Sequence, residues 1–180
     1  KKMKIVLVGI NAKYIHTNLA VRSLQANAGK YRDEVEIAEY TINHSIQEIL
    51  SDLFDREPDV VGFSCYLWNI EYVMRLAQDW KKIWPQGKIV VGGPEVSYNP
   101  EKTFEQYPFV DLLIRGEGEN TFKEVLAWLH GEKQSRAELS GVAYLEEGEL
   151  HIGPPQKAMD MDDLVFPYES LDGLENKILY

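Results

Sequence analysis

The sequence KIVLVG at residues 4–9 decides the fold, because it is a short, uninterrupted apolar run near the start of the chain. A strand that is apolar on both faces is typical of a parallel sheet with helices on either side. Three later runs have the same character: residues 59–64 (DVVGFS), 88–92 (KIVVG) and 110–115 (VDLLIR). Residues 35–40 (VEIAEY) alternate instead and indicate an edge strand.

Amphipathic segments separate these runs, so that strands and helices alternate along the chain. We predict helices over residues 18–29, 69–84, 99–107 and 120–130. A further helix is predicted to begin at Ser45, which forms a capping box with Glu48. This alternation predicts an α/β fold with a doubly wound, five-stranded parallel sheet.

The pattern changes after residue 140. Residues 141–145 and 149–152 flank Glu146-Glu147-Gly148 and indicate a β-hairpin. Pro154-Pro155 then opens an acidic segment that is typical of a linker. We therefore interpret residues 1–140 as an α/β domain, residues 141–155 as a hairpin appendage and residues 156–180 as a linker.

Composition excludes several classes of protein. The 180 residues suffice for one domain whose core needs no disulfide or structural metal. A single cysteine, Cys65, excludes a disulfide framework and a self-contained iron–sulfur cluster. The formal charge of −10 disfavours a nucleic-acid partner, and no apolar run approaches the roughly 20 residues of a membrane span. The four histidines lack the spacing of metal ligands, which disfavours a metal site. From the composition as a whole we expect a soluble cytoplasmic protein.

Ligands of doubly wound sheets bind at the carboxyl ends of the strands. The loops expected there, residues 11–17, 64–69, 92–95 and 116–119, are rich in glycine, aromatic and amide groups and poor in catalytic pairs. The last loop comes close to a dinucleotide fingerprint, but it follows the fifth strand and its glutamates would repel a pyrophosphate. Glycines and aromatic rings instead favour a large, mostly uncharged ligand.

Three motifs stand at the ends of predicted strands: VVGFS at residues 60–64, VVGGPE at residues 90–95 and DLLIRGEGE at residues 111–119. In this order and spacing they resemble the cobalamin-binding domain found at the N-terminus of many radical S-adenosylmethionine enzymes. That group includes relatives of the anaerobic magnesium-protoporphyrin IX monomethyl ester oxidative cyclase. Residues 161–167 (MDDLVFP) resemble the family's linker into its next domain.

The resemblance implies a flavodoxin-like, Rossmann-like domain that holds cobalamin, with the corrin over the strand ends and the nucleotide tail between strands and helices. By position, Ser64 would hydrogen-bond the dimethylbenzimidazole end, and Gly92 and Gly93 would line the tail groove. Residues 116–119 would face the corrin rim or the tail, and the loop after the first strand would lie under cobalt. The implied cofactor-binding residues are Asn11, Lys13, Tyr14, Ser64, Cys65, Tyr66, Trp68, Gly92, Gly93, Pro94, Glu95, Gly116, Glu117, Gly118 and Glu119, with no catalytic residue and no metal ligand among them.

Two departures from related families refine this expectation. Cobalamin mutases and methionine synthase carry Asp-x-His-x-x-Gly in the loop after the first strand, whereas Lys13 stands in place of the histidine here. A protonated lysine cannot bind a metal, so we expect base-off cobalamin without a protein His ligand. The Cys-x-x-x-Cys-x-x-Cys motif of the radical enzymes does not occur in these 180 residues.

In the family that cysteine motif follows the Phe-Pro linker. The resemblance therefore implies that the [4Fe–4S] cluster, S-adenosylmethionine and the radical S-adenosylmethionine barrel belong to a missing C-terminal part of the same parent chain. The fragment alone is expected to have no turnover. The parent would be a methyltransferase or an oxidative cyclase-like enzyme.

Two alternatives remain open from the residues. In the first, the domain has kept the fold but lost the cofactor, and it serves as a module for docking or substrate recognition. The lysine at position 13 motivates this hypothesis. In the second, the domain is a small α/β enzyme that acts on a nucleotide, although the loop glutamates and the lack of a phosphate loop argue against this.

Overall fold

The computed structural model describes residues 2–12, 18–157 and 160–165. Within these residues seven strands form one sheet in the order β2-β1-β3-β4-β5-β6-β7. The first five are parallel: β1 (Ile5–Asn11), β2 (Val35–Thr41), β3 (Val60–Ser64), β4 (Lys88–Gly92) and β5 (Leu112–Ile114). This confirms the predicted five-stranded parallel sheet, with β2 at its edge, and it brings the carboxyl ends of β1, β3, β4 and β5 to one side.

The predicted hairpin is present and consists of β6 (Val142–Glu146) and β7 (Glu149–Ile152). Its turn has positive φ at Glu147 and Gly148, 51° and 81°, as the tightest hairpin turns require. Instead of standing apart as an appendage, the hairpin continues the main sheet, because β6 pairs antiparallel with β5. The pairing occupies the backbone groups of β5 that would otherwise form an exposed edge.

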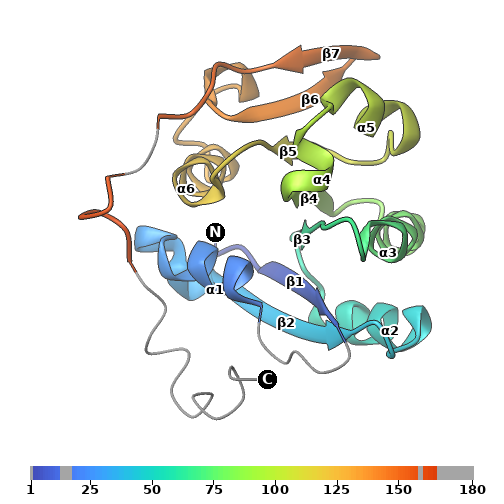
Figure 1. Cartoon of the computed structure of the whole chain (residues 1–180). Coiled ribbons are helices and arrows are strands. Elements are labelled where there is room, and N and C mark those ends of the chain that lie inside the picture. The colour runs from blue at the N-terminus through green and yellow to red at the C-terminus, as the bar shows by residue number, and fades with distance from the viewer. Residues whose placement is uncertain (1, 13–17, 158–159, 166–180) are drawn as a thin grey trace.

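Helices cover both faces of the sheet (Figure 1). One face carries α1 (Leu19–Ala26) and α6 (Gly118–Leu129), and the other carries α2 (Ile46–Arg56), α3 (Ile70–Ile83) and α5 (Pro100–Gln106). Sequence caps begin several of them: Asn18 accepts a hydrogen bond at the start of α1, and Ser45 and Glu48 form the predicted capping box of α2. The doubly wound arrangement follows, with a separate apolar layer on each side.

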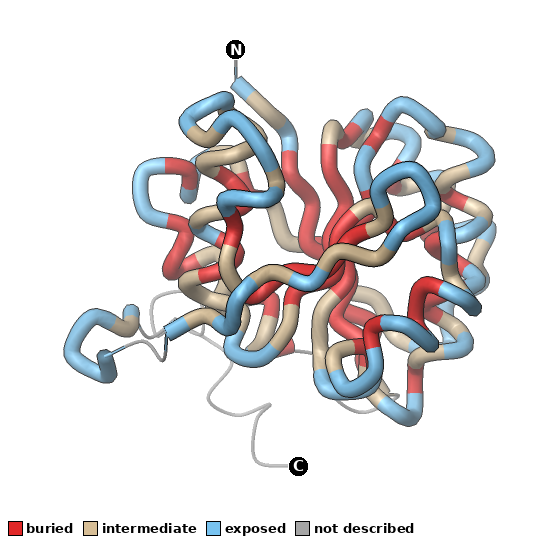
Figure 2. Tube along the Cα trace, turned by 90° about the horizontal axis from the view of Figure 1, so that it is seen from above, coloured by how far each residue is buried: buried red, intermediate tan, exposed pale blue. Residues whose placement is uncertain are grey.

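Strand alternation divides the core in two. Val6 and Val8 of β1 face α2 and α3, whereas Ile5 and Leu7 face α1 and α6. Both sets are buried, which explains why the strand sequence is apolar throughout. Figure 2 shows the buried strands running through the centre, with exposed segments around them.

Three short elements were not predicted from the sequence: η1 (Gly29–Glu34), α4 (Pro94–Ser97) and η2 (Arg136–Glu138). The helix expected over residues 120–130 begins earlier, at Gly118. One residue separates β4 from α4 and three separate β5 from α6, so these two loops at the carboxyl ends of the strands are short turns into helices.

Candidate functional site

An apolar groove lies on the face of the sheet that carries α1 and α6. Helix α1 packs on β1 and β2, and α6 packs on β5, so β3 and β4 lie between the two helices. The groove has a volume of about 220 Å³ and reaches the carboxyl ends of the strands. Its lining consists of Ile5, Leu7, Ala20, Val21, Leu24, Val60, Gly62, Phe63, Ser64, Tyr66, Val90, Val91, Gly92, Gly93, Pro94, Ile114, Gly116, Gly118, Glu119 and Phe122.

Three glycines shape the wall of this groove. A Cβ atom at Gly62, inside β3, would lie 2.8 Å from Leu7 Cδ2, and one at Gly118 would lie 3.1 Å from Leu24 Cδ2. At Gly92 an added Cβ would make only ordinary contacts, 3.7 Å from Ile114. A glycine inside a strand often marks close approach by a ligand or another backbone. Glycine at positions 62 and 118 thus lets Leu7 and Leu24 pack close to the backbone, and Gly92 has room for an added side-chain atom.

Ser64 supplies a polar group to the mostly apolar groove. It ends β3, pairs in register with Gly92 and is 9% exposed. Within the part of the chain that the structure describes, its hydroxyl has no hydrogen-bond partner. Its Oγ is not among the buried polar atoms that lack a hydrogen-bond partner, so solvent in the groove reaches the hydroxyl. The hydroxyl is therefore available to a polar atom of a ligand in the groove.

The turn from β4 into α4 forms one wall. Gly93 has φ of 110°, and a Cβ there would overlap the carbonyl oxygen of Cys65. Ser97 holds the turn, because its hydroxyl donates to the carbonyl oxygens of Gly93 at 2.7 Å and Ile114 at 3.1 Å. Sequence reasoning missed Ser97, which has no motif of its own. Its bonds tie the Gly-Gly-Pro turn to the end of β5.

The Gly-Glu-Gly-Glu loop forms the facing wall and leads into α6. Gly116 has φ of 71°, in the left-handed region that favours glycine. Glu119 lies in the first turn of α6, where a carboxylate complements the helix dipole. Its Oε1 accepts a hydrogen bond from Ser23 Oγ of α1 at 2.9 Å. The two helices that flank the groove are thus joined at its rim.

Eight of the fifteen residues named from the sequence line the groove, namely Ser64, Tyr66, Gly92, Gly93, Pro94, Gly116, Gly118 and Glu119. Asn11, Cys65, Trp68, Glu95 and Glu117 do not, and Lys13 and Tyr14 lie outside the described residues. Cys65 packs in the core on the opposite face of the sheet, and burial raises the pKa of its thiol to about 12. Trp68 is 51% exposed and stacks on Tyr66, with ring centroids 6.3 Å apart.

Sequence reasoning missed the helical side of the groove. Ala20, Val21 and Leu24 come from α1, and Phe122 comes from α6. These residues look like ordinary core positions of amphipathic helices, so the sequence gives no direct sign of them. Gly62 could have been identified from the sequence, because it is a glycine inside a strand of otherwise bulky residues.

Metal-ligating groups are not gathered at the groove. Among the described residues, no group of three or more His, Cys, Asp or Glu side chains could hold a metal ion. The described histidines, His44, His130 and His151, are absent from the groove lining. No described helix has the length and apolar character needed to cross a membrane.

Several known proteins have sequences similar to this chain. A cobalamin-dependent radical SAM methyltransferase, TokK of Streptomyces tokunonensis, is 33% identical over 172 residues, which are 92% of this chain and 24% of that protein. The anaerobic magnesium-protoporphyrin IX monomethyl ester cyclase of Rubrivivax gelatinosus is 23% identical over 143 residues, covering 78% of this chain and 26% of that enzyme. The chain thus spans about a quarter of the length of these relatives.

Solved structures share the fold. The cobalamin-dependent S-adenosylmethionine radical enzyme OxsB, with aqua-cobalamin and S-adenosylmethionine bound, superposes with a TM-score of 0.74 at 21% identity, covering 95% of this chain and 25% of that one. The B12 binding domain model matches residues 5–126, which include β1 to β5 and most of α6. That match covers more than half of the sequence, and the chain therefore belongs to the B12 binding domain family.

Proposed function

We propose that this chain is the cobalamin-binding domain of a radical S-adenosylmethionine enzyme and that the groove between α1 and α6 receives the nucleotide tail of cobalamin. The observation that carries the proposal is the groove itself. It is apolar, opens at the carboxyl edge of the sheet and contains the unpaired Ser64 hydroxyl. A flat aromatic base with one ring nitrogen matches this combination of apolar walls and a single donor.

The residues present fit such a tail. Gly92 leaves room over the sheet, and Gly62 and Gly118 let Leu7 and Leu24 pack close at the groove wall. Apolar side chains such as Leu24 and Phe122 supply the contacts that a desolvated ring requires. The Ser64 hydroxyl would donate to the base nitrogen, which would then need no other partner in the groove.

The corrin would lie across the carboxyl edge. Gly93, Pro94 and the 116–119 loop reach the groove mouth, and the stacked rings of Tyr66 and Trp68 offer a flat apolar surface beside it. The loop after β1, with Asn11 at its start, would lie under cobalt. Asn11 is buried at the end of β1, which fixes where that loop begins.

We further propose that cobalt is bound base-off and without a protein histidine. The described histidines have other neighbours: His44 contacts the Thr41 backbone, His130 pairs with Glu34, and His151 stacks on Tyr144. Lys13 stands where related families place the histidine, and a protonated amine has no lone pair to donate. Cob(II)alamin bound to the chain should therefore give an EPR spectrum without nitrogen superhyperfine splitting, and His16→Ala should leave that spectrum unchanged. Nitrogen splitting that His16→Ala removes would contradict the proposal.

Cobalamin supplies a carrier for methyl groups when bound. This chain's residues would hold and orient that carrier, and the radical S-adenosylmethionine barrel of the parent chain would hold the [4Fe–4S] cluster and S-adenosylmethionine. In this proposal residues 1–140 and the hairpin at 141–155 form the carrier module, and residues 156–180 lead toward the barrel. Both a methyltransferase and an oxidative cyclase-like parent fit the relatives found.

A second candidate is a module that uses the same fold for docking without cofactor. The observation in its favour is the exposure of large side chains after β3 and β4, where Leu67 is 78% and Tyr98 is 92% exposed. Retention of corrinoid separates the two candidates, because a docking module needs no groove.

The test is an optical titration of the purified chain with hydroxocobalamin and methylcobalamin, followed by desalting. The proposal expects retained corrinoid with a base-off spectrum. Ser64→Leu, which fills the groove, should abolish retention, and Ser64→Thr, which keeps the hydroxyl, should preserve it. Failure of the wild-type chain to retain corrinoid, with or without the rest of the parent chain, would favour the docking module.

A further inference from the structure

The last described residues of the chain are held by one side chain of α1. Asn27, the C-cap of α1, accepts a hydrogen bond from the Val165 backbone N–H at 2.8 Å through Oδ1. Its Nδ2 donates to the Val165 carbonyl oxygen, also at 2.8 Å. In Figure 1 the segment 160–165, drawn in orange-red, lies close to α1. Asn27 thus binds both backbone groups of a residue 138 positions away.

The same side-chain amide also hydrogen-bonds to α1, the helix that Asn27 caps. Nδ2 of Asn27 donates to the carbonyl oxygen of Ser23 at 2.8 Å, one turn earlier in α1. The hydroxyl of Ser23 donates in turn to Glu119 Oε1 at 2.9 Å. Glu119 lines the groove at the start of α6. Two sets of hydrogen bonds therefore meet at Ser23: its carbonyl oxygen links it to Asn27 and Val165, and its hydroxyl links it to Glu119 at the groove rim.

Burial makes these bonds more than incidental surface contacts. Asn27 is only 5% exposed, so water does not readily replace the Val165 backbone as its partner. Asn27 binds only backbone atoms of Val165. It therefore fixes the path of the segment without depending on the side chain at position 165. The three bonds of the Asn27 amide share one group and polarise one another, and the link onward to Glu119 runs through the position of the Ser23 residue.

We propose that Asn27 is a positioning residue that couples docking of the 160–165 segment to the rim contact between Ser23 and Glu119. When the segment is docked, the last turn of α1 is held and the rim bond is favoured. When the rim bond is broken, docking of the segment is weakened. A ligand that orders the groove would then strengthen docking, and docking would strengthen ligand binding by the same factor. This last step rests on the proposed function.

The first arm of the test uses the ligand-free chain and hydrogen exchange at the Val165 amide. Asn27→Ala removes the partners of Val165 and should speed its exchange about tenfold. Ser23→Ala keeps the carbonyl that Asn27 binds and removes only the link to Glu119, and both Ser23→Ala and Glu119→Ala should speed exchange about threefold. Ser135→Ala removes a comparable hydroxyl at an exposed cap and should leave exchange unchanged.

In the double variant Asn27→Ala with Glu119→Ala, exchange should be no faster than in Asn27→Ala alone, because the coupling has already been lost. The proposal is overturned if Ser23→Ala and Glu119→Ala leave Val165 exchange at the wild-type rate. This arm needs no cofactor, so its outcome is independent of the proposed function.

The second arm adds hydroxocobalamin. Val165 exchange should slow in the wild-type chain and stay unchanged in Ser23→Ala, and Asn27→Ala should bind hydroxocobalamin more weakly by the factor measured for the slowing. Equal affinity of the wild-type chain and Asn27→Ala would refute coupling to the ligand. Lack of any binding by the wild-type chain would instead count against the proposed function, with the first arm still deciding the network.

Discussion

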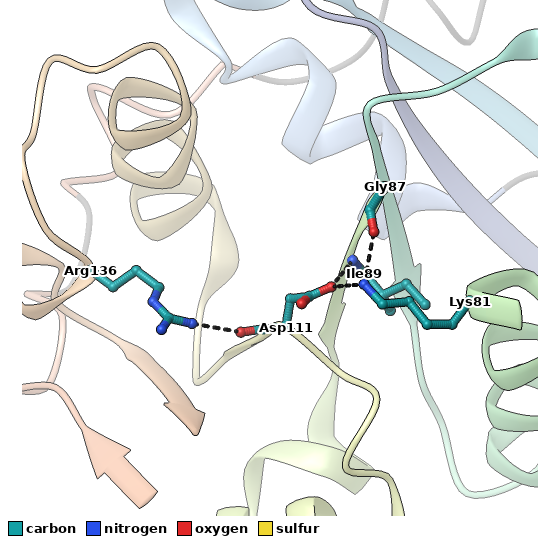
Figure 3. Close-up of polar contacts among 5 residues, drawn as sticks. All are labelled: Lys81, Gly87, Ile89, Asp111 and Arg136. Atoms are coloured by element: carbon teal, nitrogen blue, oxygen red, sulfur yellow. Dashed lines mark hydrogen bonds and ion pairs between the residues drawn. The ribbon is translucent and has the colours of Figure 1, made fainter. Parts of the chain in front are cut away.

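The carboxylate of Asp111 and the ammonium group of Lys81 meet at 2.9 Å, at the amino-terminal ends of β4 and β5 (Figure 3). Asp111 Oδ2 also accepts from the Ile89 backbone N–H at 2.7 Å, and Lys81 Nζ also donates to the Gly87 carbonyl oxygen at 2.8 Å. Asp111 precedes β5, Ile89 lies in β4 and Lys81 lies in α3. One carboxylate therefore joins two strands and a helix where β4 and β5 begin.

Removal of this carboxylate should cost more than removal of its cationic partner. Asp111→Ala leaves the Ile89 N–H without its acceptor and is expected to lower the free energy of unfolding by about 2 kcal/mol. Lys81→Ala loses a half-exposed ion pair and should cost less than about 1 kcal/mol. Urea denaturation measures both. Corrinoid retention by the folded variants should stay at the wild-type level, since neither side chain lines the groove. An equal cost for the two variants would contradict this account.

The groove can be blocked without strain at Gly92. An added Cβ there makes only ordinary contacts, so Gly92→Leu should fold and place its side chain in the groove. Corrinoid retention should fall at least about tenfold, because the tail and the new side chain compete for one space. Lys88→Leu puts the same side chain at the exposed start of β4 and serves as the matched control. Unchanged retention in Gly92→Leu would show that the ligand does not use the groove.

Substitution of Gly93, the next residue, should destabilise the fold, whereas substitution of Gly92 should be tolerated. Gly93 has φ of 110°, which is disfavoured for side chains, and a Cβ there would overlap the Cys65 carbonyl oxygen. Gly93→Ala is therefore expected to lower the free energy of unfolding by about 3 kcal/mol or more. Gly92→Ala should cost less than about 1 kcal/mol, at the level of an ordinary glycine replacement in a strand. Similar denaturation midpoints for the two alanine variants would refute the difference in geometry.

The Cys65 thiol should be unreactive in the folded chain. Burial raises the pKa of its thiol from 9.0 to about 12, so the reactive thiolate is scarce at pH 8. Labelling by a thiol reagent should therefore follow unfolding, with fast reaction only in denaturant. The raised pKa also gives a direction for stability: the contribution of the neutral thiol is complete below pH 9 and is lost as pH rises toward 12. Rapid labelling of the native chain would contradict the buried position.

The central parallel strands were predictable from the sequence because each is a short apolar run bounded by polar or glycine residues, and β2 was predictable from its alternation. The parallel order of β1, β3, β4 and β5 followed from alternation with helices, and the capping box at Ser45 located the start of α2 correctly. The hairpin was predicted from its turn residues, but its pairing with β5 was not. The sequence of the three-residue strand β5 does not indicate whether its next neighbour is parallel or antiparallel. Register between distant strands is a tertiary property.

The candidate site was predictable on its loop side and hidden on its helix side. Gly93 and Gly116 stand in turns with positive φ, where glycine has a clear backbone meaning, and Gly92 and Gly118 stand at the end of β4 and the start of α6 beside them. Leu24 and Phe122 occupy amphipathic helix positions where groove and core look alike in sequence. The interaction between Ser23 and Glu119 joins residues 96 positions apart, and no local pattern indicates such a contact.

Pairing of β6 with β5 has a consequence for how the protein can be cut. A chain that ends at residue 140 would leave the backbone of β5 open along one side, and would also lose the bond from Arg115 N–H to the Gly141 carbonyl oxygen at 2.8 Å. An open edge next to a buried apolar strand invites pairing with a second copy. A fragment trimmed to the five parallel strands is therefore expected to aggregate, whereas one that retains the hairpin through Pro154 should stay monodisperse at the same concentration.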